Sequence, residues 1–112
     1  HYGIENTRFL NKVLEALEQN YRNERFRIED LYRDLGTSRV QLHRKLTALT
    51  GQPASNFIRS FRLHKARKLL LETEMNVSEV AHDVGFTDPN YFTRAFVREH
   101  GITPKEMRGS QV

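Results

Sequence analysis

The sequence predicts an all-α fold of about seven helices, in which two helix-turn-helix subdomains are joined by a long linker helix. Three observations lead to this fold class. Apolar residues recur at i, i+3, i+4 and i+7, the spacing of one buried helical face, in two separate places. A glycine follows each of these runs, and a further helical segment follows each glycine. The stretch between the two copies, residues 53–73, reads as a single helix.

The second helix pair, near residues 77–100, has the clearest start and stop signals. Asn76, with Glu79 three residues later, is a capping-box pattern at the start of its first helix. Gly85 ends that helix, where a residue tolerant of positive φ is needed. Asp88 then caps the next helix, and Pro89 takes its first position, where the missing N–H costs nothing. The predicted inward-facing residues are Val77, Val80, Ala81, Val84, Phe92 and Phe96, and Gly101 with Pro104 closes the pair.

The first helix pair, near residues 28–50, repeats this pattern at an offset of 49 residues before the turn and 50 after it. The one-residue slip lies in the turn, where an insertion is cheap. Ser38 and Gln41 form a capping-box pattern that opens its second helix. The chain therefore contains a degenerate internal duplication. The predicted inward-facing residues are Ile28, Leu31, Tyr32, Leu35, Leu42, Leu46 and Leu49, and corresponding pairs include Gly36 and Gly85, Arg44 and Arg94, and Gly51 and Gly101.

The remaining segments are assigned from periodicity and composition. Residues 7–21 predict a helix with a broad apolar stripe, followed by a polar loop at 20–26. Residues 1–6 have no clear periodicity and are interpreted as a linker remnant, and residues 109–112 as a C-terminal tail. Because the chain starts at His1 without methionine, we expect it to be part of a longer protein. The predicted apolar contacts of the linker helix are Phe57, Ile58, Phe61, Ala66, Leu69 and Leu70.

Positive charge is concentrated in the middle of the chain. The net charge is +4, but from Gly36 to Leu71 there is no Asp or Glu at all. A solvated basic face is the simplest explanation, yet eight cations without one acid over 36 residues indicate a polyanionic partner. These cations are Arg39, Arg44, Lys45, Arg59, Arg62, Lys65, Arg67 and Lys68, accompanied by His43 and His64.

The predicted linker helix has a length that suits DNA as this partner. About 20 residues at 1.5 Å each span about 30 Å. Successive major-groove openings on one face of B-DNA are ~34 Å apart. The helix could therefore hold the two helix-turn-helix units one DNA turn apart. A helix of the same length that only forms part of the core would show the same hydrophobic pattern.

Composition sets further limits. A chain of 112 residues with 38% apolar residues fits one small folded domain with a modest core. No run approaches the 18 or more apolar residues of a membrane span, and no signal-peptide pattern occurs. The chain has no cysteine, which excludes disulfides and thiolate metal sites and fits a reducing compartment.

The amino-acid sequence of the second unit contains a motif that is specific to one protein family. Residues 84–96 read Val-Gly-Phe-Thr-Asp-Pro-Asn-Tyr-Phe-Thr-Arg-Ala-Phe, followed by Gly101-Ile102-Thr103-Pro104 and Arg108. This resembles the signature of the AraC/XylS family of bacterial transcription regulators, and the resemblance extends back to about Thr7. It implies a DNA-binding domain over residues 7–108 that binds double-stranded DNA sequence-specifically, with two recognition helices in successive major grooves.

A recognition helix presents its N-terminal residues to base edges, on the face opposite the core. In family members that this chain resembles, the base-reading positions match Val40, His43 and Arg44 in the first unit, and Pro89, Asn90, Thr93 and Arg94 in the second. The chemistry agrees, because an arginine can bind O6 and N7 of guanine bidentately, asparagine can read adenine, and valine can contact a thymine methyl. The alternatives are a solvated charge or phosphate contact for each arginine and packing at the domain edge for Val40.

Phosphate contacts and three departures from the family pattern complete the predicted site. We expect phosphates to be held by Ser38, Arg39, Arg62, Lys65 and Thr87, with helix N-termini offering N–H groups. Pro89 stands where a hydrogen-bonding side chain is common, so it can make only apolar contact. Arg27 stands where a Ser or Thr cap is usual, so that helix end is expected to fray. Met107 replaces an aromatic residue before Arg108, which concerns packing only.

Three other functions compete with DNA reading. An enzyme is disfavoured because the five histidines (His1, His43, His64, His82 and His100) lack paired metal-ligand spacing and no HExxH, GxSxG or Gly-rich phosphate loop occurs. We therefore expect no metal and no cofactor. A helical protein-interaction module is disfavoured by the acid-free stretch and by only two repeats. Non-specific or RNA binding remains open and would depend on salt but little on sequence.

The resemblance also implies a setting. Family members usually carry a ligand-binding, dimerisation or phosphorylation-responsive domain in the same polypeptide. Residues 38–46 and 49–52 look like those of output domains at the C-terminus of hybrid two-component sensors. We expect the domain to act in the cytoplasm, within a full-length protein that could be membrane-anchored, as a monomer or weak dimer, with RNA polymerase as a further partner. The operator, target genes, inducing signal and sign of regulation are not readable from the sequence.

Overall fold

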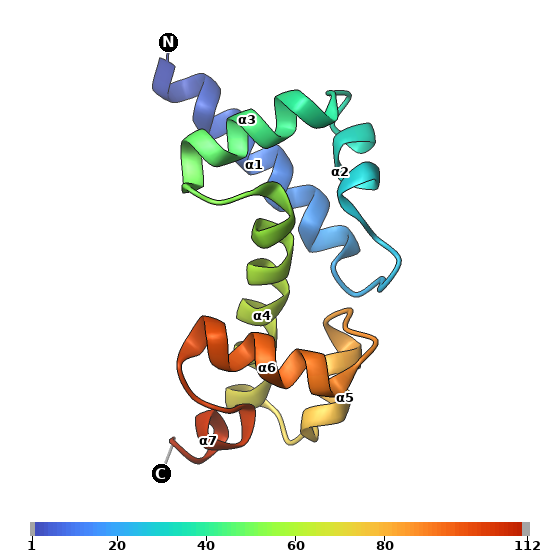
Figure 1. The fold of residues 1–112 in the computed structure, drawn as a ribbon, viewed down its shortest axis with the longest axis vertical. Coiled ribbons are helices and arrows are strands. Elements are labelled where there is room, and N and C mark those ends of the chain that lie inside the picture. The colour runs from blue at the N-terminus through green and yellow to red at the C-terminus, as the bar shows by residue number, and fades with distance from the viewer. Residues whose placement is uncertain (1, 111–112) are drawn as a thin grey trace. The chain divides into compact units, whose positions relative to one another are not determined.

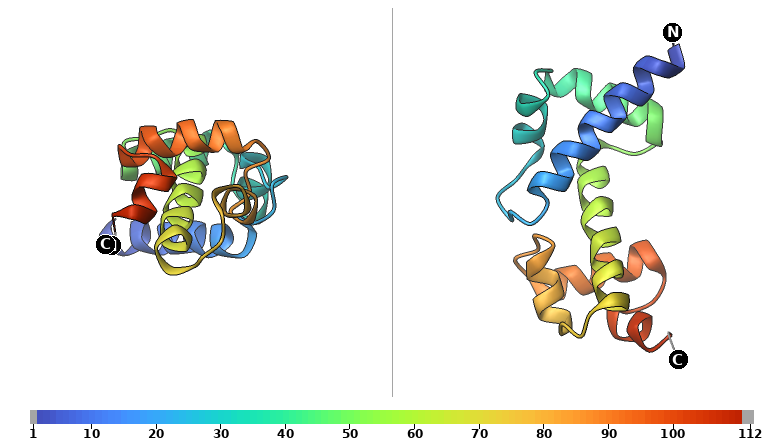
Figure 2. Two further views of the ribbon diagram at one scale, coloured as in Figure 1. Left: turned by 90° about the horizontal axis from the view of Figure 1, so that it is seen from below. Right: turned by 180° about the vertical axis from the view of Figure 1, so that it is seen from behind.

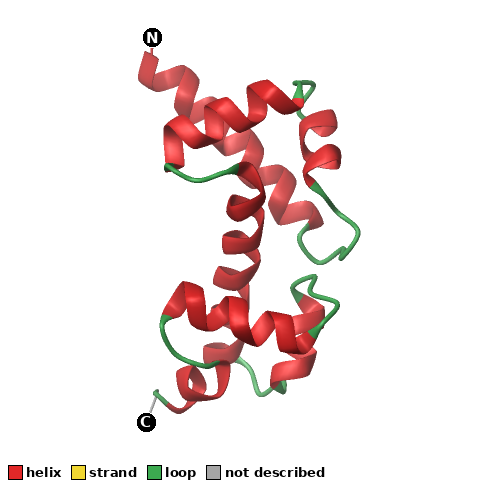
Figure 3. Cartoon of the chain, viewed as in Figure 1, coloured by secondary structure: helices red, strands yellow, loops and turns green. Residues whose placement is uncertain are grey.

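The computed structural model describes residues 2–110 of the chain, with side chains from Asn6 onward. Within that range all regular structure is helical, and loops join the helices (Figure 3). The predicted all-α fold with seven helices is confirmed. Figure 1 labels the helices, which are α1 (Tyr2–Asn20), α2 (Ile28–Asp34), α3 (Arg39–Thr50), α4 (Ala54–Glu72), α5 (Val77–Asp83), α6 (Pro89–His100) and α7 (Pro104–Gly109).

The chain forms two compact units. The first unit comprises the residues up to Tyr21 together with Arg25–Arg59, and the second comprises Arg22–Glu24 together with the residues from Ser60 onward. The boundary at 59–60 lies inside α4, which is one uninterrupted helix that can be followed in both views of Figure 2. Each unit therefore holds one helix-turn-helix and one part of the linker helix.

The first unit packs α2 against α1 and α3. The fully buried side chains of these three helices are aliphatic, and the buried rings of Tyr21 and Phe26 lie in the segment between α1 and α2. The fully buried aliphatic residues are Val13 and Leu17 of α1, Leu31 of α2, and Leu42 and Leu46 of α3. Gly51, at φ +74°, ends α3 in the left-handed conformation that glycine adopts without strain.

The second unit packs α6 against α5 and α7 around an aromatic core. The Phe92 ring lies 5.1 Å from the Phe86 ring in an edge-on arrangement and 5.7 Å from the Phe96 ring, measured between centroids. Such pairs add to the burial energy of the rings themselves. Both Phe92 and Phe96 are fully buried, as their spacing in the sequence predicts.

Two side chains, one on α6 and one on α7, contact backbone carbonyls of α4 and of Thr73, the residue that follows it. Arg108 donates from Nε to the Leu70 carbonyl (3.1 Å) and from Nη2 to the Thr73 carbonyl (3.2 Å). These carbonyls lie at the C-terminal end of α4, where C=O groups have no partner within the helix. His100 Nε2 lies 3.2 Å from the Leu63 carbonyl oxygen. Thus polar contacts from α6 and α7 reach the linker helix and the residue that follows it.

Helix caps agree with the sequence at α5 and differ at α2 and α3. Asn76 and Glu79 form the full predicted box, with both reciprocal bonds at 2.8–2.9 Å. The predicted box at α3 is only half formed. Gln41 N–H donates to the Ser38 hydroxyl at 3.1 Å, but the Gln41 side chain instead accepts from the Thr37 hydroxyl.

At α2, the expected fraying is offset by a residue inside the helix. Arg27 N–H donates to the Asp30 carboxylate at 2.9 Å, so the helix start keeps one half of a capping box although Arg27 has no acceptor to offer. The helix begins at Ile28, immediately after Arg27.

Four predictions from the sequence need correction. Residues 2–6 belong to the predicted linker remnant, yet α1 begins at Tyr2, because extending a formed helix requires no second nucleation step. Leu49, predicted to face inward, is 37% exposed, because it lies near the end of α3, beyond the last core position, Leu46. The predicted apolar set of the linker helix omits Leu63, which is 1% exposed. α7 also continues to Gly109, where a tail is predicted; residues 1, 111 and 112 lie outside the described range.

Candidate nucleic-acid interface

The outward face of α3 joins cations to one apolar side chain. Arg39, Val40, His43 and Arg44 are all exposed, and together they line a shallow hollow on the helix surface. Val40 is 72% exposed, far more than any other large apolar side chain among the described residues. The three predicted base-reading residues of the first unit therefore share one accessible face, at the N-terminal end of α3.

The start of α3 is fixed by hydrogen bonds from its own sequence. The Ser38 hydroxyl accepts a hydrogen bond from the Gln41 N–H. It thereby satisfies one of the four N–H groups at the helix start that have no partner within the helix. The Thr37 hydroxyl donates to the Gln41 side-chain oxygen at 2.9 Å, and this hydrogen bond stabilises the turn before the helix. These contacts hold the first turn of α3, which carries Arg39 and Val40, in a defined orientation. Ser38 remains exposed, as a phosphate contact requires.

The outward face of α6 is built differently. Asp88 accepts from the Asn90 N–H at 2.9 Å and fixes the helix start, and Pro89 is half-buried. The Thr93 hydroxyl donates to the Pro89 carbonyl at 3.1 Å. Asn90 and Arg94, one turn apart, are exposed, and so is Thr87 in the preceding turn. This face therefore presents an amide and a guanidinium beside the ring of Pro89.

The two predicted phosphate contacts on α4 already have partners within the protein. Arg62 is half-buried, donates from Nη2 to the Asn23 carbonyl at 3.0 Å, and burial lowers the pKa of its guanidinium. The Lys65 ammonium lies 5.4 Å from the centre of the Phe61 ring. Sequence reasoning did not foresee these contacts, because charge alone does not reveal which cations fold back on the protein.

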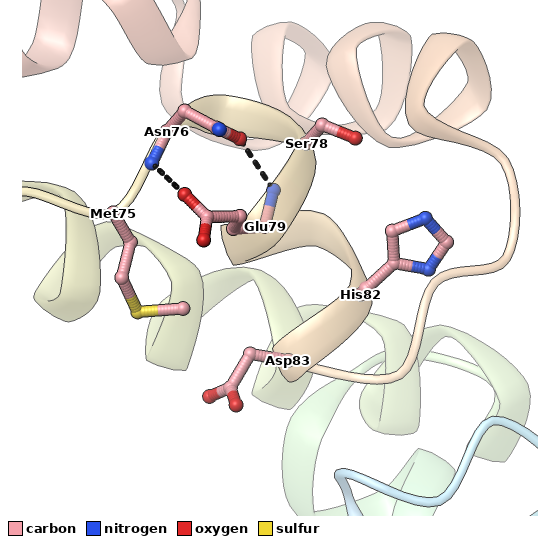
Figure 4. Close-up of a pocket in the computed structure, with 6 residues that line it drawn as sticks. All are labelled: Met75, Asn76, Ser78, Glu79, His82 and Asp83. Atoms are coloured by element: carbon pink, nitrogen blue, oxygen red, sulfur yellow. Dashed lines mark hydrogen bonds between the residues drawn. The ribbon is translucent and has the colours of Figure 1, made fainter.

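The outward face of α5 shows no catalytic or metal-binding arrangement among its described residues. Met75, Asn76, Ser78, Glu79, His82 and Asp83 line an open hollow there (Figure 4). Glu79 caps the helix start, and Asp83 forms an ion pair with Arg22 at 3.8 Å. His82 projects away from both carboxylates in Figure 4. Within residues 2–110 no three His, Cys, Asp or Glu side chains gather as a metal site would require.

The described helices can be compared with the length and apolar character of a membrane-spanning helix. None of them combines the length and the apolar character that a bilayer-spanning segment needs. The longest, α1 and α4, each have 19 residues and carry charged side chains throughout.

The fold defines a class, the domain with two helix-turn-helix units, and in each unit the second helix presents an exposed N-terminal face. A family described as "Helix-turn-helix domain" matches residues 31–110. Two curated relatives are 33% identical, "Histidine kinase P4" of Formosa agariphila over 99 residues and the "HTH-type transcriptional activator RhaS" of Mannheimia succiniciproducens over 97. They match 88% and 87% of this chain, which spans only 7% and 36% of their lengths.

Solved structures give the same result. An AraC-type transcriptional regulator from Chromobacterium violaceum superposes with a TM-score of 0.88 at 26% identity, covering 100% of this chain and 97% of that one. The C-terminal domain of the two-component response regulator yesN from Fusobacterium nucleatum gives 0.77 at 33% identity, covering 86% and 93%. The DNA-binding domain of AdpA, solved with a target DNA, gives 0.80 at 29% identity, covering 90% and 89%.

The chain therefore belongs to the AraC/XylS-type helix-turn-helix family. It is a DNA-binding domain of the transcription-regulator class and not an enzyme.

Proposed function

We propose that this domain reads a two-part site on double-stranded DNA, with α3 and α6 each inserted into a major groove. The observation that carries the proposal is the exposure of both N-terminal helix faces, combined with an acid-free sequence around the first of them. The base-reading residues are Val40, His43 and Arg44 on α3, and Pro89, Asn90, Thr93 and Arg94 on α6.

The two arginines are the principal hydrogen-bonding readers. Within the described part of the chain, neither Arg44 nor Arg94 forms an ion pair, so each guanidinium can bind O6 and N7 of a guanine. Asn90 offers an amide to adenine. Because the Thr93 hydroxyl is engaged with the helix backbone, Thr93 and Pro89 contribute mainly apolar surface.

Phosphate contacts position the domain without reading sequence. Ser38, Arg39 and Thr87 fill this role best, because all three are exposed next to the start of a recognition helix. Lys65 is a further candidate, since an ammonium that contacts an aromatic ring on one side can contact a phosphate on another. Arg62 is the weakest candidate, because its burial and its bond to Asn23 give it a structural role.

The domain serves, in our proposal, as the output module of a bacterial two-component regulator in the cytoplasm. Similarity to a histidine kinase and to a response-regulator C-terminal domain supports this setting. The signal would reach the domain from regulatory parts of a longer polypeptide, which could be membrane-anchored. RNA polymerase would be a further partner, and the isolated domain would be monomeric or weakly dimeric.

Selection of bound duplexes from a random DNA pool, followed by sequencing, tests base reading and requires no assumed operator sequence. We expect two short motifs about 10–11 base pairs apart, one for each recognition helix. A single motif would contradict reading by both units. Salt-sensitive binding without any enriched motif would overturn sequence-specific recognition altogether.

A further inference from the structure

Val40 is exposed to an extent that folding does not explain. The other exposed large apolar side chains of the described residues, Leu14, Leu49, Tyr91 and Val97, are 36–39% exposed, whereas Val40 is 72% exposed. A valine gains stability from burial, and this one contributes almost none to the core of its unit. With so little of its surface covered, packing at the domain edge does not account for it either.

The surroundings of Val40 restrict what can cover it. Its hollow is lined only by α3 residues, of which Arg39 and Arg44 are cationic and His43 is a hydrogen-bonding side chain. No acid occurs between Gly36 and Leu71 to balance them. An apolar protein partner would have to bury these cations without counter-charges, at high cost. The partner must therefore present an apolar group next to negative charge and hydrogen-bond acceptors.

The major groove of DNA offers that combination. The C5-methyl group of thymine projects into it beside the acceptor atoms of neighbouring bases, and phosphates line its rim. Val40 and Arg44 are four residues apart and so lie on one face of α3, about 5–6 Å apart at Cβ. This separation suits neighbouring base pairs, which are stacked about 3.4 Å apart.

We propose that Val40 makes the first unit a reader of one pyrimidine C5-methyl group, next to the guanine bound by Arg44. The inference rests on the proposed base reading by α3 and specifies what that helix selects. A valine side chain neither donates nor accepts a hydrogen bond. It therefore senses the methyl group without distinguishing the thymine O4 from the cytosine N4. Consequently 5-methylcytosine replaces thymine at this position, whereas uracil and unmodified cytosine do not.

The test uses the duplex obtained by selection from the random pool. Each thymine in turn is replaced by deoxyuridine, which removes only the methyl group, and affinity is measured by fluorescence anisotropy. At one thymine in the half-site of α3 we expect binding about fourfold weaker, the equivalent of ~0.8 kcal/mol for one buried methyl-sized group. Cytosine at that position should weaken binding as much, and 5-methylcytosine should restore it to within about twofold of thymine.

Two variants assign the effect to Val40. In Val40→Ala the preference for methylated pyrimidines should fall well below the level of about fourfold expected for the wild type, because the shorter side chain keeps only part of the apolar contact. Because the side chain is exposed, the variant should fold like the wild type. Val97→Ala is the matched control, since it removes the same side chain from the C-terminal half of α6 and should leave the methyl preference intact.

The outcomes separate this inference from the proposed function. An enriched motif whose thymines all tolerate uracil would overturn methyl reading while leaving base recognition in place. A methyl preference that stays at about fourfold in Val40→Ala would also overturn it, because another residue would then be the reader. Failure to enrich any motif would overturn base recognition by α3, and methyl reading with it.

Discussion

The two helix-turn-helix units share one sequence pattern but are stabilised in different ways. In the first unit the two core positions of α3 hold the aliphatic residues Leu42 and Leu46, whereas the corresponding positions of α6 in the second unit hold Phe92 and Phe96. The second unit also has a complete capping box and the Arg108 contacts to α4. The first unit has a half-formed box at α2, and the outward face of its α3 carries more cations than that of α6. The duplicated pattern thus determines the fold of both units. Their side chains differ, so that the second unit has more stabilising polar contacts and the first has the more cationic outward helix face.

The largest expected effect tests the two cores against each other. Phe92→Ala removes a fully buried ring and both of its ring contacts, and should cost about 4–5 kcal/mol of unfolding free energy. Leu42→Ala, at the corresponding position, should cost about 3 kcal/mol. Urea unfolding followed by far-UV circular dichroism measures both. Equal losses would mean that the aromatic contacts add nothing to burial.

The Arg108 contacts should account for the next largest difference between the units. Arg108→Met keeps an aliphatic stem but leaves the Leu70 and Thr73 carbonyls without their donor, and should cost about 1.5–3 kcal/mol. Arg67→Met, at an exposed arginine of α4, is the control and should stay within about 0.5 kcal/mol of the wild type. If both variants lose the same stability, charge rather than carbonyl capping is responsible.

The two proposed DNA-reading faces are compared by removing one arginine from each. Arg44→Ala and Arg94→Ala should each weaken binding to the selected duplex by about 1–3 kcal/mol and relax the preference at one base pair, in different half-sites. Lys65→Ala should instead weaken binding to all sequences and reduce the slope of log affinity against log salt by about one. An arginine variant that loses affinity equally on every sequence would be a phosphate contact.

The smallest expected effect concerns the helix starts. Asn76→Ala should cost about 1 kcal/mol, because it removes the acceptor of the Glu79 N–H. Arg27→Ser should do the opposite and add about 0.5–1 kcal/mol, since it supplies the missing acceptor at a position where Asp30 already provides the other half of the box. Thermal unfolding of the two variants measures both changes. A destabilised Arg27→Ser would show that the arginine makes a contact worth more than a cap.

The sequence predicted well those features that depend on residues close together in the chain. The Asn76 and Glu79 box, the buried Phe92 and Phe96, and the exposed Val40 and Arg44 all follow from spacing within one helix, where geometry leaves little freedom. Repetition of the pattern, at an offset of 49 residues before the turn and 50 after it, then indicated the two helix pairs, and the stretch between them predicted the linker helix.

What the sequence did not predict depends on neighbours far along the chain. The bonds from Arg108 to Leu70 and from Arg62 to Asn23 join residues 38 and 39 positions apart, and no local pattern encodes them. Competition between hydrogen-bond partners is a second reason why a prediction failed. The Gln41 side chain could accept from the Thr37 hydroxyl or from the Ser38 N–H, and in the structure it accepts from Thr37. The DNA contacts themselves remain predictions.

The second unit is not contiguous in the chain, and this restricts how the domain can be dissected. Arg22–Glu24 belong to it, although the segments on either side of them belong to the first unit. A fragment that starts at Ser60 would strip Asp83 of its ion-pair partner and Arg62 of the Asn23 carbonyl. A chimera that exchanges the second unit must therefore import this three-residue segment as well. The second unit cannot be exchanged as one continuous stretch of chain.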